Sequence, residues 1–144
     1  MNYCEIIYSL AHFNRAHRSH IHEIMESEGL FYGQLPILET VKKLGSCTQK
    51  EISKELGVTP PSVTTSVKRL VKKGYLEKKA DENDLRNTRI SITEKGLQKT
   101  IACREKFDEF DKKTFSALTD EECETFKSLI NKLLDSIEKE DKHD

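Results

Sequence analysis

The sequence contains no tryptophan, three prolines, and no apolar run approaching the roughly 20 residues of a membrane-spanning helix. It also lacks a glycine-rich phosphate loop, an H-E-x-x-H pair and a Ser/His/Asp set in a workable order. These motifs are typical of nucleotide-binding proteins, metalloproteases and serine hydrolases. We therefore expect that the protein is not an enzyme, has no catalytic residues, uses no cofactor and has no membrane partner.

The cysteines are few and scattered, with no C-x-x-C pair among them. Such spacing favours reduced thiols in a cytosolic protein over a disulfide framework. The chain also does not open with a basic segment, an apolar stretch and a cleavage site. We therefore expect a cytoplasmic protein. The four cysteines are Cys4, Cys47, Cys103 and Cys123.

The formal net charge is only −1, but the charges are unevenly distributed. Residues 45–93 contain ten Lys and Arg against six Asp and Glu, whereas the rest of the chain contains fourteen against nineteen. A basic middle between acidic ends favours a module that faces a polyanion and is carried on a solvated scaffold. Hydrophobic residues make up 35% of the 144 positions. That is a small supply for a monomer and favours burial against a second copy.

The first third of the sequence predicts two amphipathic helices. Apolar residues recur every three or four positions along residues 3–25, which predicts one long helix. Glu28-Gly29 ends it, and Pro36 lies near the start of the next helix, which Gly45 closes. The residues expected to face inward on this second helix are Leu35, Leu38, Val41 and Leu44.

The next segment predicts two short helices joined by a tight turn. Residues 48–51, Thr-Gln-Lys-Glu, form a capping box that opens a helix ending at Gly57. After Val58, Thr59 is expected to cap the following helix with its side chain, and Pro60 occupies its first position. The residues expected to face inward on this helix, 59–73, are Val63, Val67 and Leu70.

The hydrophobic period then changes to two. Residues 75–79 and 88–92 read as a hairpin with a polar tip at 80–87. Thr93 caps a long helix, and residues 119–122 form a second capping box that opens the last helix. The long helix is expected to carry its apolar side chains at Leu97, Ile101, Phe107 and Phe110. The predicted order is ααααββαα, a mainly α fold with a small β-hairpin.

Two short helices followed by a hairpin are typical of a winged helix-turn-helix, whose second helix enters the major groove of DNA. The outer face of helix 59–73 carries short hydroxyls near its start, which suit base edges, and cations further along, which suit phosphates. An amphipathic helix with an ordinary polar exterior is the alternative. The outward-facing candidates for DNA binding are Pro61, Ser62, Thr64, Thr65, Lys68 and Arg69.

The hairpin tip holds one arginine among carboxylates. Arg86 suits a narrow minor groove, where negative potential is concentrated, if Asp84 orients it. The alternative is an exposed ion pair that contributes little. The residues alone leave both interpretations open.

The stretch Asp84 to Gly96, DLRNTRISITEKG, resembles the D-x-R-x-x-x-[VI]-x-[LI]-T-x-x-G signature of the MarR family of regulators. Residues 48–78 are similar to that family's helix-turn-helix, and residues 118–122 to the opening of its last helix. The resemblance covers nearly the whole chain. It implies an N-terminal dimerisation helix at 1–32, a winged helix-turn-helix domain at 33–96 and C-terminal dimerisation helices at 97–144.

The resemblance also implies a function: a homodimer that binds double-stranded operator DNA at an inverted repeat and represses until a small ligand or oxidation releases it. Arg86 would then read the minor groove with Asp84 as its partner, while Thr64 and Thr65 would reach bases. The sequence departs from the family pattern at Thr65, where arginine is frequent, and at Lys68, where aspartate is common.

Three kinds of switch could release such a regulator. A thiol sensor needs a thiolate and usually a resolving partner, and neither Cys4 nor Cys47 has an obvious one. A zinc sensor needs convergent ligands, and of the histidines in the first helix only His17 and His20 share a ridge. We therefore expect no metal site.

A small-molecule pocket is the family's usual switch. Four residues are candidates for its lining: Tyr8, His12, Phe31 and Tyr32. Two alternatives stay open. One is a thiol- or zinc-responsive regulator of the same family, and the other is a winged-helix module that binds protein and not DNA.

Overall fold

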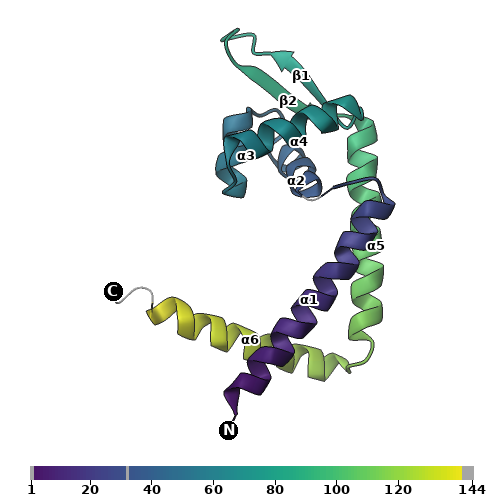
Figure 1. Cartoon of the computed structure of the whole chain (residues 1–144), viewed down its shortest axis with the longest axis vertical. Helices are drawn as coiled ribbons and strands as arrows, with labels where there is room; N and C mark the ends of the chain where they lie inside the picture. The colour runs from purple at the N-terminus through teal and green to yellow at the C-terminus, as the bar shows by residue number, and fades with distance from the viewer. Residues whose placement is uncertain (1, 32, 141–144) are drawn as a thin grey trace. The chain divides into compact units, whose positions relative to one another are not determined.

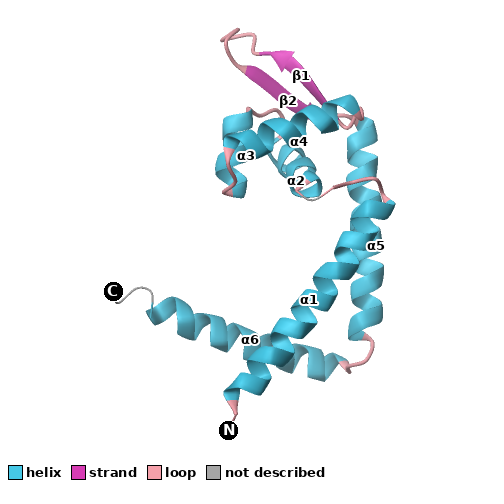
Figure 2. Ribbon diagram, viewed as in Figure 1, coloured by secondary structure: helices cyan, strands magenta, loops and turns pink. Residues whose placement is uncertain are grey.

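The computed structural model describes residues 2–31 and 33–140. Its order of elements, ααααββαα, is the predicted one, and the fold class is confirmed (Figures 1 and 2). The chain divides into two compact units, Met1–Phe107 and Asp108–Asp144. The elements are α1 (Tyr3–Ser27), α2 (Gln34–Leu44), α3 (Gln49–Leu56), α4 (Pro60–Lys72), β1 (Leu76–Ala80), β2 (Thr88–Ile92), α5 (Glu94–Phe115) and α6 (Asp120–Glu140).

The start and end of α3 follow from its sequence. Thr48 Oγ1 accepts a hydrogen bond from the Glu51 main-chain N–H at 3.2 Å, and Glu51 Oε2 accepts one from the Thr48 N–H at 2.8 Å. This predicted capping box satisfies two donors that the first turn leaves without helical partners. Gly57 ends the helix with φ of +63°, a left-handed conformation that costs glycine little.

The capping of α4 differs from the prediction. Thr59 occupies the N-cap position, but its hydroxyl caps no main-chain N–H and instead lies 3.0 Å from the Ser62 hydroxyl. Prolines fill the first two helical positions, so Pro61 has no N–H to offer, and at the third position the Thr59 hydroxyl pairs with the Ser62 side chain instead of its N–H. The helix therefore begins on the fixed φ of its two prolines and on the burial of its inner face.

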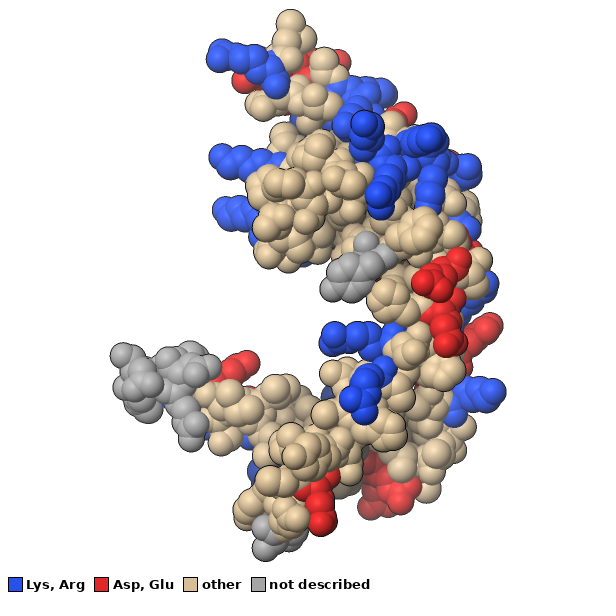
Figure 3. Space-filling model, in the orientation of Figure 1, with Lys and Arg blue, Asp and Glu red and all other residues tan. Residues whose placement is uncertain are grey.

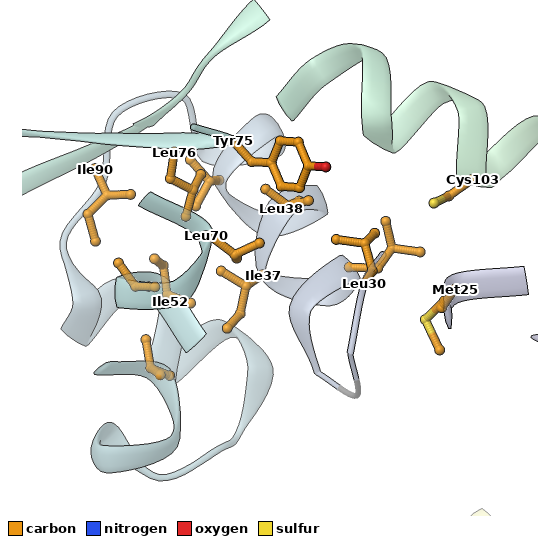
Figure 4. Close-up of a cluster of buried hydrophobic side chains, with 14 of the residues drawn as sticks. Met25, Leu30, Ile37, Leu38, Ile52, Leu70, Tyr75, Leu76, Ile90 and Cys103 are labelled. Carbon is orange, nitrogen blue, oxygen red and sulfur yellow. The ribbon is translucent and has the colours of Figure 1, made fainter. Parts of the chain in front are cut away.

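The core of the first unit lies between α2, α3, α4 and the hairpin. The α4 residues Val63, Val67 and Leu70 are all fully buried, as predicted. Figure 4 shows Leu70 near Leu38 of α2 in this cluster. On α2 the inner face differs in part from the prediction, because Ile37 is buried whereas Leu44, at the end of the helix, is 40% exposed.

Strands β1 and β2 pair antiparallel, with Leu76 opposite Ile92 and Ala80 opposite Thr88. The tip between them is therefore one residue shorter than predicted, residues 81–87. Cys47 adds a short third segment to this sheet: its N–H and carbonyl bond to the Ile90 carbonyl and N–H at 3.0 and 2.7 Å. This pairing ties the hairpin, here called the wing, to the start of α3.

Helix α5 starts directly against β1. Thr93 Oγ1 accepts from the Gly96 N–H at 3.1 Å, which confirms the predicted cap. A Cβ at Gly96 would lie 2.1 Å from the Tyr75 carbonyl oxygen, so only glycine fits this approach. The expected apolar face is partly wrong: Phe107 is buried, but Ile101 is 37% exposed. The other buried positions of α5 hold small side chains, namely Gly96, Thr100 and Cys103.

The second unit contains α6, which the predicted capping box of Thr119 and Glu122 opens. Glu122 N–H donates to Thr119 Oγ1 at 3.2 Å, and Thr119 N–H donates to Glu122 Oε2 at 2.8 Å. None of the described side chains of α6 is buried. Its apolar residues are instead among the most exposed large hydrophobics of the described chain, with Leu129, Leu133 and Ile137 at 53, 55 and 59%. In the described residues, no helix has the length and apolar character needed to cross a bilayer.

Candidate nucleic-acid interface

The outer face of α4 is exposed along its whole length. Because Val63, Val67 and Leu70 point into the core, the helical period turns the remaining residues toward solvent. Every residue predicted there is exposed: Pro61, Ser62, Thr64, Thr65, Lys68 and Arg69. Neither Lys68 nor Arg69 has an acidic side chain within ion-pair distance in the described parts of the chain. Their charges are therefore available to an anionic partner.

The hydroxyls of this face differ in what they already bond. Thr64 Oγ1 lies 2.8 Å from Gln49 Oε1 of α3 and 3.0 Å from the Pro60 carbonyl oxygen of its own helix. Ser62 pairs with Thr59. The Thr65 hydroxyl makes no hydrogen bond to any of the described residues. Of the two threonines predicted to reach bases, Thr65 is thus the one with an unengaged hydroxyl.

Asp84 organises the wing tip. Its Oδ1 accepts from the Arg86 main-chain N–H at 3.1 Å, which forms an Asx turn. Its main-chain carbonyl accepts from the Asn87 N–H at 2.9 Å, which closes a turn around the same residues. The same Oδ1 lies 3.6 Å from Arg86 Nε. The Arg86 side chain is 94% exposed. Asp84 therefore shapes the backbone from which Arg86 projects, while the guanidinium itself stays in solvent.

A second arginine, which the sequence patterns did not indicate, holds the base of the wing. Arg89 donates from Nε to Ser46 Oγ at 3.2 Å and from its terminal nitrogen to the Ser46 carbonyl, and it lies 3.8 Å from Glu51 Oε2. Glu51 belongs to the capping box of α3. Arg89 thus joins β2 to the first helix of the helix-turn-helix. This is a tertiary contact, so no local sequence pattern predicts it.

Lysine and arginine side chains gather over the part of the first unit that carries α4 and the wing (Figure 3). All five of the following are exposed: Lys68, Arg69 and Lys72 of α4, and Lys78 and Lys79 of β1. Lys79 lies 3.9 Å from Glu77, an exposed pair that contributes little. This surface is the basic middle that the uneven charge distribution indicated.

The end of α4 is fastened to the connection between α1 and α2. Lys73 Nζ bonds to the Gly29 carbonyl, lies 3.5 Å from Gln34 Oε1 and sits 4.9 Å from the centre of the Phe31 ring. Gln34 is 1% exposed, so this anchor reaches the interior. The orientation of α4 is therefore coupled to the segment that follows α1.

A neighbouring ion-pair cluster fastens the end of α1 to α5. The Glu28 carboxylate bonds to Lys106 and, at 2.9 Å, to Lys99, and its side chain is 13% exposed. The hydrogen bonds from Lys106 and Lys99 hold the pKa of Glu28 below its ordinary value of 4.5. The carboxylate is therefore charged at neutral pH and joins the two helices within the first unit.

All four cysteines are free thiols in the structure, two of them buried. Burial raises the pKa of both Cys47 and Cys103, and the carboxylate of Glu51 adds to the effect at Cys47. A raised pKa lowers the fraction of reactive thiolate. Cys4 is exposed on α1. Among the described residues there is no group of three or more His, Cys, Asp or Glu side chains that could hold a metal ion.

A cavity of about 870 Å³ lies in the first unit between α4, α2 and the inner sides of α1 and α5. Most of its walls are apolar, and the ion pair of Arg104 with Glu39 lies at its edge. The α4 residues that reach it are Pro61, Ser62, Val63, Thr65 and Ser66. The opposite walls include Ile21, Met25, Leu35, Ile37, Leu56 and Phe107.

Of the four residues expected to line a pocket, the three that the structure describes are not among the residues that line this cavity. Tyr8 and Phe31 are 73 and 58% exposed, and His12 is exposed as well. Tyr32 lies outside the described residues. The expectation relied on aromatic character, whereas the cavity walls come mainly from aliphatic and small side chains.

The fold and this exposed basic helix beside a wing define a winged helix-turn-helix regulator. Comparison with known proteins agrees: a model described as MarR family matches residues 31–88. The chain is 34% identical over 97 residues to the HTH-type transcriptional regulator YwhA of Bacillus subtilis (strain 168), a match that covers 67% of this chain and 70% of YwhA. The chain belongs to the MarR family of transcriptional regulators.

Two solved structures are similar over nearly the whole chain. The YusO protein from Bacillus subtilis has 27% identity and a TM-score of 0.83, over 92% of this chain and 94% of that one. A single-residue mutant of S. aureus MepR, solved bound to an oligodeoxyribonucleotide, has 24% identity and a TM-score of 0.71, over 95% of this chain and 99% of that one. At that identity the likeness to MepR concerns the fold.

Proposed function

We propose that this protein is a sequence-specific double-stranded DNA-binding regulator that acts as a homodimer on an inverted-repeat operator. The observation that carries the proposal is the outer face of α4, which is exposed throughout and free of acidic partners at Lys68 and Arg69 among the described residues. The first helix of such a motif crosses the backbone while the second enters the major groove. Here α3 would take the first role and α4 the second.

The chemistry of each side chain indicates whether it would contact bases or phosphates. Thr65, with its unengaged hydroxyl, is the candidate for base edges, and Lys68 and Arg69 are candidates for phosphates. Arg86 projects from the wing tip and would enter the minor groove, whose negative potential attracts arginine. Asp84 would hold the tip in the shape from which Arg86 reaches.

The homodimer is supported by the apolar surface that a single chain leaves uncovered. On α6, Leu129, Leu133 and Leu134 are at least half exposed, and the first turns of α1 expose Ile7 by 62%. A helix that exposes several large apolar side chains in this way is uncommon on monomers and marks an interaction site. We assign residues 1–32 and 97–144 to the dimer and residues 33–96 to DNA. A two-fold dimer places its recognition helices about 34 Å apart, one turn of DNA, which favours an inverted repeat.

We further propose repression that a small molecule relieves. A dimer seated on an operator excludes other proteins from that stretch of DNA. The cavity beside α4 supports the second half of the proposal, because Ser62, Thr65 and Ser66 contribute to it from the helix that would read DNA. A largely apolar molecule there would bias the position of α4 to the extent that it binds one position better than another.

The experiment is a selection of bound sequences from random duplexes, followed by anisotropy titrations on the selected site. Between 50 and 200 mM salt we expect affinity to fall steeply, by about 10³-fold if six or more phosphates are contacted. Arg86→Ala should cost about 1–3 kcal/mol of specific binding. Thr65→Ala should change base preference more than the salt slope.

The matched control is Lys42→Ala, which removes an exposed cation of α2 that belongs neither to the dimer segments nor to α4 and the wing. Its affinity for the selected site should equal that of the wild type. A salt-insensitive interaction, or a selection that enriches no sequence, would favour a protein-binding winged helix and contradict the proposal.

A further inference from the structure

We propose that Gln49 is a DNA-backbone contact and that Thr64 positions it: the Gln49 side-chain amide donates to a phosphate oxygen of the operator. The inference rests on the proposed DNA-binding function and deepens it. It also changes the role of Thr64, which then acts through Gln49 instead of reading a base itself.

The placement of Gln49 is tightly determined. It is the first residue of α3, directly after the N-cap Thr48, and the reciprocal bonds between Thr48 and Glu51 fix the backbone there. From this position its side chain reaches α4, where Gln49 Oε1 accepts from Thr64 Oγ1 at 2.8 Å. The first turn of α3 and the first turns of α4 are thereby joined by a direct side-chain bond.

The hydrogen bond from Thr64 uses the oxygen of the Gln49 amide and leaves its nitrogen available to another partner. A glutamine side chain offers one acceptor oxygen and two N–H donors on a planar group. With Oε1 directed at Thr64, Nε2 lies on the other edge of that plane. Within the described part of the chain, no protein group accepts from Gln49 Nε2. The half-buried Gln49 therefore presents donors in a fixed direction without a protein partner.

The surroundings indicate an anionic acceptor. Gln49 borders a surface groove of about 630 Å³ between α3 and the start of α4, together with Lys50, Ser53, Lys54 and Pro60. Neither lysine has an acidic partner within ion-pair distance among the described residues. A phosphate oxygen accepts only, so it suits a group whose acceptor is already used, and the first helix of this motif lies where the backbone passes.

The same geometry limits what Thr64 can do. Its single hydroxyl proton faces two acceptors, Gln49 Oε1 and the Pro60 carbonyl oxygen, so it has no proton left for a base. Thr64 therefore acts as a positioning residue. Direct donation to base acceptors from the first turns of α4 falls to Thr65.

The test is a set of variants of the full-length protein, measured by anisotropy on the selected operator and on its single-base variants. A hydrogen bond to a charged group corresponds to a loss of about tenfold to a hundredfold for Gln49→Ala. The factor should be the same on every sequence, and the salt slope should stay unchanged, because a neutral amide releases no counterion. Lys54→Ala, in contrast, should lower the salt slope by about one.

The role of Thr64 is tested by coupling. Thr64→Val keeps the shape of the side chain and removes the hydroxyl, so it should weaken binding toward the level of Gln49→Ala. The double variant should bind the operator no more weakly than Gln49→Ala alone. Thr64→Ser, which keeps the hydroxyl, should bind with nearly wild-type affinity. Gln98→Ala, which removes an exposed amide from α5, is the matched control: with the dimer shown intact by sedimentation, it should bind like the wild type. Thermal unfolding midpoints confirm that each variant is folded.

A direct probe replaces single operator phosphates by uncharged methylphosphonates. At one phosphate per half-site, the replacement should weaken operator binding by the wild type and leave operator binding by Gln49→Ala unchanged. Independent losses for Thr64→Val and Gln49→Ala, or a change in base preference with Thr64→Val, would overturn the inference while duplex binding itself persists. Failure of the wild type to bind any duplex would instead overturn the proposed function.

Discussion

The cluster of Glu28 with Lys99 and Lys106 allows a prediction of stability. Replacing Glu28 by glutamine keeps the size of the side chain but removes the charge that both lysines bond. Hydrogen bonds to charged groups contribute about 1.5–3 kcal/mol when sheltered, and exposed ion pairs about 0–1 kcal/mol. With the carboxylate 13% exposed but the lysines 24 and 46% exposed, solvent screening reduces the effect. We expect Glu28→Gln to lower the free energy of unfolding by about 1–2 kcal/mol at pH 7.

The assay is urea unfolding at equal protein concentration, since dimerisation makes the midpoint concentration-dependent. With a slope of about 2 kcal/mol per molar urea, the midpoint should fall by roughly 0.5–1 M. The pH dependence has a definite sign. Because the folded pKa of Glu28 lies below 4.5, its contribution is complete above that value and disappears as the pH falls through the folded pKa.

The difference between wild type and Glu28→Gln should therefore be constant from about pH 6 to 8 and shrink in acid. Glu55→Gln is the control, because it removes a carboxylate from an exposed pair with Lys43. Its midpoint should shift less. Equal midpoints for the wild type and Glu28→Gln at pH 7, or a difference that does not change with acidification, would refute the reasoning.

Three further predictions concern the fold and the dimer. Gly96→Ala should destabilise by at least about 2 kcal/mol in urea unfolding, because its Cβ would lie 2.1 Å from the Tyr75 carbonyl oxygen; a wild-type midpoint would contradict this packing. In the native protein, Cys47, 1% exposed, should react with a thiol reagent only on unfolding; rapid modification of native Cys47 would show that the core opens. Leu133→Glu should yield monomers in sedimentation and weaken operator binding, and a persistent dimer would exclude α6 from the interface.

Much of the fold could be predicted because its signals are local. The capping boxes at Thr48 and Thr119 involve residues three positions apart, and both form as their sequences indicate. Thr59 looks like a third cap, but Pro61 lacks the N–H of the second helical position and the Thr59 hydroxyl pairs with the Ser62 hydroxyl instead of the Ser62 N–H. The inner face of α5 departs from its apolar pattern because close approach to Tyr75 requires glycine at position 96, and the buried positions that follow hold Thr100 and Cys103.

The interface could be predicted in part for the same reason. Exposure of Thr65 and Lys68 follows from the helical period once Val63 and Val67 are assigned to the core. The contacts of Gln49 with Thr64 and of Arg89 with Ser46 join segments 15 and 43 positions apart. No periodicity connects such residues, so these partners emerge only from the tertiary structure.

Chemical interference on the operator tests the central claim, that the outer face of α4 enters the major groove while Arg86 reaches the minor groove. Duplexes methylated at guanine N7 or adenine N3 are incubated with the protein, and bound duplexes are separated from free ones. The positions at which methylation prevents binding are then mapped for the wild type and for Arg86→Ala. The account predicts two clusters of N7 interference one helical turn apart, with flanking N3 interference that disappears only in Arg86→Ala. N7 interference absent from a bound duplex, or N3 signals unchanged in Arg86→Ala, would contradict it.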